Sequence, residues 1–64
     1  MNVAKHHALI AVNQAIESLM KLGAWDLVSK AQDWRYALQG GTCKAQTARK
    51  AVNDLLERAT LPPG

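Results

Sequence analysis

The sequence predicts an all-α fold, a small three-helix domain. Three segments, about 4–22, 24–39 and 43–60, carry apolar residues three and four positions apart, the spacing of one helix face. Glycines separate these segments, and no stretch alternates apolar and polar residues as a half-buried strand would. A chain of 64 residues makes one domain at most. We therefore assign residues 1–61 to a single helical domain and residues 62–64 to a C-terminal tail.

The first predicted helix is clearly amphipathic. Ile10 is the exception among its apolar residues, because it falls on the polar side. Gly23 is expected to end the helix, since glycine readily takes the left-handed conformation that terminates many helices. The face expected in the core consists of Ala8, Leu9, Val12, Ala15, Ile16, Leu19 and Met20.

The second predicted helix carries all three aromatic rings of the chain. At about 100° per residue, one of its faces is apolar and has Trp34 as its largest member. The rings of Trp25 and Tyr36 fall on a different face, roughly opposite, and have no obvious core to enter. The apolar face consists of Leu27, Ala31, Trp34 and Leu38, with Ala24 close by, and the other face of Trp25, Ser29, Gln32 and Tyr36.

The third predicted helix follows Gly40-Gly41, the strongest break in the sequence. Thr42 is expected to be its N-cap, with the hydroxyl accepting a hydrogen bond from a free backbone N–H. Pro62-Pro63 cannot continue the helix. Its apolar face consists of Ala45, Ala48, Val52, Leu55, Leu56 and Ala59.

The small size of the chain predicts self-association. A domain of about 60 residues buries only about 60% of its unfolded surface. Chains below about 70–80 residues usually need disulfides, a metal, very good helix packing or a partner subunit. Cys43 is the single cysteine, which excludes an internal disulfide. We therefore expect tight helix packing and a helical homodimer.

The N-terminal segment predicts neither export nor membrane insertion. Its apolar run, residues 8–12, is shorter than the core of a signal peptide, about 7–15 residues. A membrane helix needs about 20 apolar residues. A lone cysteine also suits a reducing compartment. We expect a cytoplasmic protein that makes no membrane contact.

Residue types that carry enzyme chemistry are sparse, so we expect no catalytic residue, metal ligand or cofactor. His6 and His7 are adjacent, and on a helix they point about 100° apart, which prevents them from sharing one metal. Cys43 has no base near it in the sequence that could activate it as a nucleophile. The segment from Gly40 to Lys44 lacks the spacing of a phosphate-binding glycine loop. The sequence therefore does not indicate an enzyme.

The aromatic residues outside the predicted core indicate a protein interface. Tryptophan, tyrosine and arginine are enriched at binding hot spots. The interface residues that we predict are Trp25, Ser29, Gln32, Tyr36 and Arg35. The alternative is that Trp25 folds back onto the first helix and Tyr36 only covers the surface.

These features predict a small non-enzymatic module that binds another protein. In size and composition the chain is similar to accessory proteins of phages and mobile elements, which act by docking onto a larger host protein. That similarity implies a larger target protein, whose activity this chain would modulate.

A cluster of basic residues supports a second interpretation, a small basic DNA-binding regulator that uses the third helix. Between Trp34 and Asn53 there are four cations and no acid, and the net charge is +3. Three of the cations lie near the start of the third helix, where positive charge opposes the helix dipole. They indicate an anionic partner, DNA or an acidic protein, unless they are ordinary solvated residues. The predicted contacts are Lys44, Gln46, Thr47, Arg49 and Lys50.

The turn between the second and third helices has the length of a helix-turn-helix link. Such turns have three to four residues and often contain glycine, as the segment from Gln39 to Thr42 does. Against this motif, Thr42, Thr47 and Lys50 fall where apolar packing residues are expected.

Overall fold

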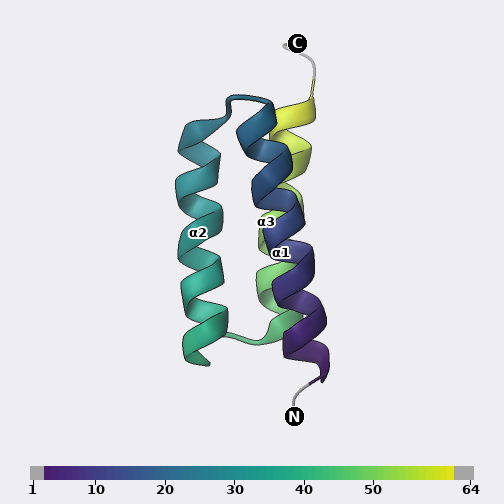
Figure 1. Ribbon diagram of the computed structural model, residues 1–64, viewed down its shortest axis with the longest axis vertical. Helices are drawn as coiled ribbons and strands as arrows, with labels where there is room; N and C mark the ends of the chain where they lie inside the picture. The colour runs from purple at the N-terminus through teal and green to yellow at the C-terminus, as the bar shows by residue number, and fades with distance from the viewer. Residues whose placement is uncertain (1–2, 62–64) are drawn as a thin grey trace.

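The computed structural model describes residues 3–61, which form three α-helices. They are α1 (Val3–Lys21), α2 (Trp25–Gly40) and α3 (Ala45–Thr60). Each helix contacts the other two, and α2 runs antiparallel to both α1 and α3 (Figure 1). This is the three-helix fold that the sequence predicts, with boundaries within two residues of those expected. The predicted tail, residues 62–64 with its two prolines, lies outside the described residues.

Both links between helices begin with the same turn, built around a glycine with positive φ. At the first link Gly23 has φ +73°, and the N–H of Ala24 donates to the carbonyl oxygen of Leu19 at 3.0 Å. Gly41 takes the same left-handed conformation, with φ +76°, at the second. This hydrogen-bond pattern satisfies carbonyls at the end of a helix and turns the chain sharply. Glycine is favoured at both places because other L-residues are strained at positive φ.

Thr42 does not cap α3 as expected. The N-cap of α3 is Lys44, which makes no side-chain capping hydrogen bond. Thr42 belongs instead to the end of α2, because its N–H and its hydroxyl both donate to the carbonyl oxygen of Ala37, at 2.9 and 3.1 Å. The turn at Gly41 requires an amide donor at the next position. Thr42 supplies that donor, which places its side chain against α2.

The core lies between the three helices and is made of small and medium aliphatic side chains. Several members of the predicted faces, Trp34 among them, are only partly buried at the edge of this core. Two further residues differ from the prediction. Met20 is 39% exposed, so its assignment to the core was wrong, whereas Val28, which the predicted face omitted, is buried. Ile10 is exposed, as predicted. The buried residues are Ala8, Val12, Ala15, Ile16, Leu19, Val28, Ala31, Leu38, Ala48, Val52 and Leu55.

Candidate interaction surfaces

The two aromatic rings assigned to an interface lie on the surface of α2. Trp25 is 63% exposed and Tyr36 is 66% exposed, while Ser29 is exposed and Gln32 is half-buried. We call these four residues the aromatic face. At 1.5 Å per residue, the eleven positions between Trp25 and Tyr36 span about 16 Å along the helix. The rings therefore form two separate contact points with polar residues between them.

Arg35 is held beside the aromatic face by contacts with both α1 and Tyr36. Its Nη1 donates to Oδ1 of Asn13 on α1 at 3.4 Å. Its Cζ lies 5.9 Å from the centroid of the Tyr36 ring, within the range of a cation–π contact. Its Nε is buried and has no hydrogen-bond partner among residues 3–61. The side chain therefore lies half-buried against α1 rather than extending into solvent.

Trp25 also belongs to a group of exposed apolar side chains at one end of the bundle. Met20 and Leu22, near the link between α1 and α2, are exposed, and Leu22 is 53% exposed. Leu61, which is 66% exposed, follows α3 at the same end (Figure 1). We call Met20, Leu22, Trp25 and Leu61 the apolar end. Sequence reasoning placed Met20 on the core face of α1, whereas the neighbouring Leu19 is the residue of that turn that is buried.

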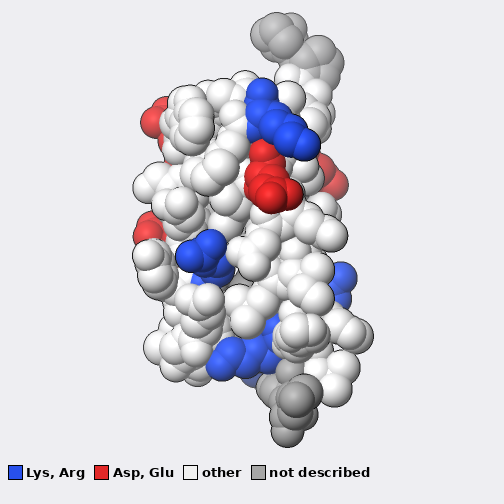
Figure 2. Space-filling model, in the orientation of Figure 1, with Lys and Arg blue, Asp and Glu red and all other residues white. Residues whose placement is uncertain are grey.

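Charge is distributed unevenly along the bundle. The part of the bundle that contains the start of α1, the end of α2 after Asp33 and the start of α3 before Asp54 holds cations and no acid among the described residues; we call it the basic half. On the face that Figure 2 shows, the acidic side chains lie in the upper half. The cations of the basic half are Lys5, Arg35, Lys44, Arg49 and Lys50.

Lys5 is a member of the basic half that sequence reasoning did not single out. Its Nζ donates to the backbone carbonyl of Gln39 at 3.0 Å. This contact places a positive charge at the C-terminal end of α2, where it complements the helix dipole. Because the two residues are 34 positions apart in the sequence, only the packing of α1 against α2 brings them together.

The predicted nucleic-acid contacts on α3 are all exposed, but they face different sides. Lys44 and Thr47 line a groove of about 480 Å³ between α2 and α3, together with Trp34. Arg49 lines the groove between α1 and α3, and Gln46 and Lys50 border both grooves. Because α2 and α3 lie side by side in antiparallel directions (Figure 1), they lack the crossing of about 90–120° that a helix-turn-helix uses.

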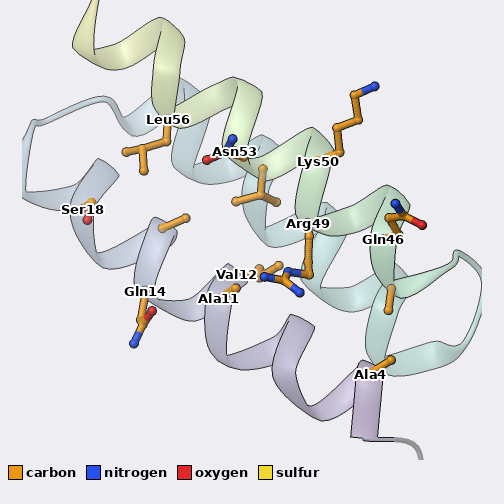
Figure 3. Close-up of a pocket in the computed structure, with 13 residues that line it drawn as sticks. Ala4, Ala11, Val12, Gln14, Ser18, Gln46, Arg49, Lys50, Asn53 and Leu56 are labelled. Carbon is orange, nitrogen blue, oxygen red and sulfur yellow. The ribbon is translucent and has the colours of Figure 1, made fainter.

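The larger groove, between α1 and α3, has an apolar floor and an open top. It has a volume of about 950 Å³. Val12 and Val52 are buried at its floor, and Ala4 and Ala11 are among the small residues on its α1 side. Arg49 reaches from α3 toward Ala11, as Figure 3 shows. No residue of α2 lines this groove, so it is distinct from the aromatic face.

His6 and His7, the two residues considered for metal binding, are both exposed near the start of α1. The rings of His6 and His7 are 6.1 Å apart between centroids and tilted by 47°. No group of three or more His, Cys, Asp or Glu side chains in this range is placed to hold a metal ion. Cys43 is a free, half-buried thiol in the link before α3.

Over the described part of the chain, none of the helices combines the length and the apolar character needed to cross a bilayer.

Comparisons with protein-family models, with curated proteins and with solved structures found no match to this chain.

Proposed function

We propose that the protein is a small non-enzymatic binding module that docks onto a larger protein through the aromatic face and Arg35. One observation carries the proposal: Trp25 and Tyr36, two of the three aromatic residues in the chain, are nearly two-thirds exposed. Large aromatic side chains contribute most to the free energy of folding or binding when they are buried. Their exposure in a small domain therefore favours burial against a partner. The adjacent apolar end would enlarge the contact.

The position of Arg35 supports the same surface. Its contacts with Asn13 and with the Tyr36 ring restrict the side chain before any partner arrives. A restricted side chain loses less conformational freedom when a partner binds, which favours affinity. Tyrosine and arginine are also two of the residue types enriched at binding hot spots.

Self-association and a cytoplasmic setting belong to the same proposal. The largest fully buried side chains are only leucines and valines, so a monomer has a modest core for its length. Pairing of two chains would bury additional apolar surface, and the exposed residues of the apolar end are suited to it. The single, free Cys43 is compatible with a reducing compartment.

The proposal is tested with two variants, Trp25→Ala and Tyr36→Ala, and with Lys30→Ala as a control on an exposed position of α2. Helicity by circular dichroism is expected to persist in all three. Partner capture from the native host and self-association in sedimentation equilibrium are expected to weaken in the two aromatic variants only. Unfolding of either aromatic variant, or equal capture by all the variants, would refute the proposal.

Binding of nucleic acid is a second candidate function, favoured by the five cations of the basic half. Phosphate contacts release counterions, so the affinity for duplex DNA would fall steeply with salt. Because the helix-turn-helix crossing is missing, we expect contacts with the phosphate backbone and little discrimination between sequences. Fluorescence anisotropy with labelled duplex DNA at two salt concentrations tests this candidate. Unchanged affinity after Arg49→Ala and Lys50→Ala would exclude it.

A further inference from the structure

We propose that the groove between α1 and α3 binds an acidic amphipathic helix of a partner protein. This surface is separate from the aromatic face, and the inference does not depend on the function proposed for that face. It depends on three features of the groove: its shape, the small side chains on one wall, and its charge.

The shape of the groove suits a helix. α1 and α3 run in the same direction, and Figure 3 shows the lining residues in two rows, from Ala4 to Ser18 on α1 and from Gln46 to Leu56 on α3. At 1.5 Å per residue the row on α1 is about 21 Å long, the length of about four helical turns. An amphipathic helix that lies in such a groove is a common mode of recognition.

The α1 wall allows a close approach. Ala4, Ala11 and Ser18 are seven residues apart, so they fall nearly along one line of the helix, and each has a small side chain. The distance between packed helix axes depends on the side chains at the contact and is about 8–10 Å. Along this line of α1 a partner helix would meet no large side chain, and it would lie over the Arg49 side chain, which crosses the groove.

The charge of the groove selects an acidic partner. The described residues that line it include the cations Arg49 and Lys50 and no acid. Figure 3 shows that the Arg49 side chain extends across the groove toward Val12 and Ala11, whereas Lys50 points away. Arg49 is thus the cation that a helix in the groove would cover, and a carboxylate of the partner would pair with its guanidinium.

The charged contact and the large apolar contact lie at different positions along the groove, which sets a spacing for the matching residues of the bound helix. Arg49 and Leu56 are seven residues apart on α3, about 10 Å along the axis. Leu56 is half-buried beside Asn53 and adds an apolar contact at the end away from Arg49. The matching partner has a carboxylate two turns away from a large apolar residue.

A second copy of this chain is less suited to the groove. The three helices of a folded copy already use their main apolar faces in their own core. On the outer side of α1, Val3 and Ile10 remain as exposed apolar residues, but α1 carries no acid in its first turn to pair with Arg49.

The test uses two 15-residue helical peptides and the full ¹⁵N-labelled chain. Both peptides carry leucines at helical spacing; one has glutamates beside them and the other has lysines at the same positions. We expect the acidic peptide to shift the amide signals of Ala11, Ser18 and Asn53, and the basic peptide to leave them unchanged.

Two variants at neighbouring positions provide the matched comparison. Arg49→Glu is expected to raise the dissociation constant of the acidic peptide at least about tenfold, and Lys50→Glu less than about twofold, because only Arg49 faces the groove. Ala11→Gln, which narrows the groove without a change of charge, is also expected to weaken binding. Circular dichroism confirms that each variant remains helical.

Several results would overturn the proposal. One is that millimolar acidic peptide shifts no amide signals, and another is that it shifts only those of the aromatic face. Equal affinity for the two peptides would also overturn it, as would an equal loss of peptide affinity in Arg49→Glu and Lys50→Glu. Groove shifts caused by duplex DNA but not by the acidic peptide would assign the groove to nucleic acid. Groove shifts on concentrating the protein alone would assign it to a second copy. If the groove does not bind the acidic peptide, the Trp25 and Tyr36 variants still test the aromatic face separately.

Discussion

Arg35 and Asn13 join α2 to α1 through a hydrogen bond of 3.4 Å between Nη1 and Oδ1. Although Asn13 is exposed, the Nε atom of Arg35 is buried and finds no hydrogen-bond partner in the part of the chain that the structure describes. The burial of an unpaired donor costs free energy, about 1–3 kcal/mol in typical cases. The hydrogen bond to Asn13 and the buried Nε affect stability in opposite directions, so we expect the net contribution of Arg35 to folding to be small.

Replacement of Arg35 by methionine is expected to leave the free energy of unfolding unchanged within about 1 kcal/mol, because the lost hydrogen bond is long and the unpaired donor disappears with it. Binding of the partner protein is expected to weaken. Urea unfolding followed by circular dichroism measures the first effect. A loss of stability above about 2 kcal/mol would instead make Arg35 a structural residue. Asn13→Ala serves as the comparison, since it removes the same bond but keeps the unpaired Nε.

Gly41→Ala and Gly40→Ala are expected to have opposite effects on stability. Apart from the adjoining backbone, a Cβ atom at either position would meet no atom of the described residues within 4 Å, so steric contact does not distinguish them. The backbone does: Gly41 has φ +76°, whereas Gly40 is the last residue of α2. We expect Gly41→Ala to destabilise by about 1 kcal/mol or more, and Gly40→Ala to stabilise by about 0.4–1 kcal/mol. Thermal unfolding of the two variants at equal concentration tests this, and equal effects would contradict it.

Leu38→Ala is expected to reduce the free energy of unfolding by about 2–5 kcal/mol, because Leu38 is among the largest fully buried side chains. Natural domains have about 0.05–0.15 kcal/mol of stability per residue, so this loss is a large part of the total for 64 residues. Chemical denaturation at fixed protein concentration provides the measurement. The control is Ile10→Ala on the exposed side of α1, for which we expect a change within about 0.5 kcal/mol. Similar losses in the two variants would place Ile10 in an interface.

Lys44→Ser is expected to stabilise the protein by about 1 kcal/mol. Lys44 has extended φ and ψ angles and is the N-cap of α3, but it makes no side-chain capping hydrogen bond. A serine hydroxyl at that position can accept a hydrogen bond from the first turn, and the substitution removes a charge that opposes the dipole. Lys50→Ser, in the helix body, is the control and should lower stability slightly, by about 0.2–0.3 kcal/mol. A thermal midpoint that does not rise in Lys44→Ser would show that the capping bond fails to form.

The helices and their ends were predictable because they depend on local patterns. Gly23 ends α1 as expected, since positive φ is a property of glycine itself. Thr42 was misassigned because it lies between the end of α2 and the start of α3 and can bond to either. Its hydrogen bonds to the carbonyl oxygen of Ala37 place it at the end of α2. A choice between two local partners cannot be read from residue types alone.

The core of α2 was predicted less well because its covered side is wider than a single line of side chains. Trp34 borders the groove toward α3, whereas Arg35 bonds to α1. Leu27 lies seven residues before Trp34, and Val28 lies seven residues before Arg35, so each falls on the same side of α2 as its later counterpart. Leu27 is half-buried and Val28 is buried. A prediction based on a single apolar line found Leu27 and missed Val28. Trp34, expected as the largest core residue, is half-buried at the edge.

The surfaces depend on three-dimensional packing and were only partly predictable. The exposure of Trp25 and Tyr36 followed from helical periodicity, because both lie off the apolar line of α2. The groove around Arg49 could not be predicted, since its two walls belong to helices at opposite ends of the sequence. Ala11 lies opposite the Arg49 side chain only because α3 packs beside α1 in the folded bundle.

The glycine turns also bear on how quickly the chain folds. Only residues 22–24 and 41–44 separate successive helices, so little chain entropy is lost when neighbouring helices meet. Helical proteins with mainly local contacts fold in microseconds to milliseconds. We expect temperature-jump relaxation in that range at low protein concentration, and a phase slower than about one second would show that another step limits folding. A chain with such short links would complete each protomer before it encounters a second molecule, so any assembly would join preformed bundles.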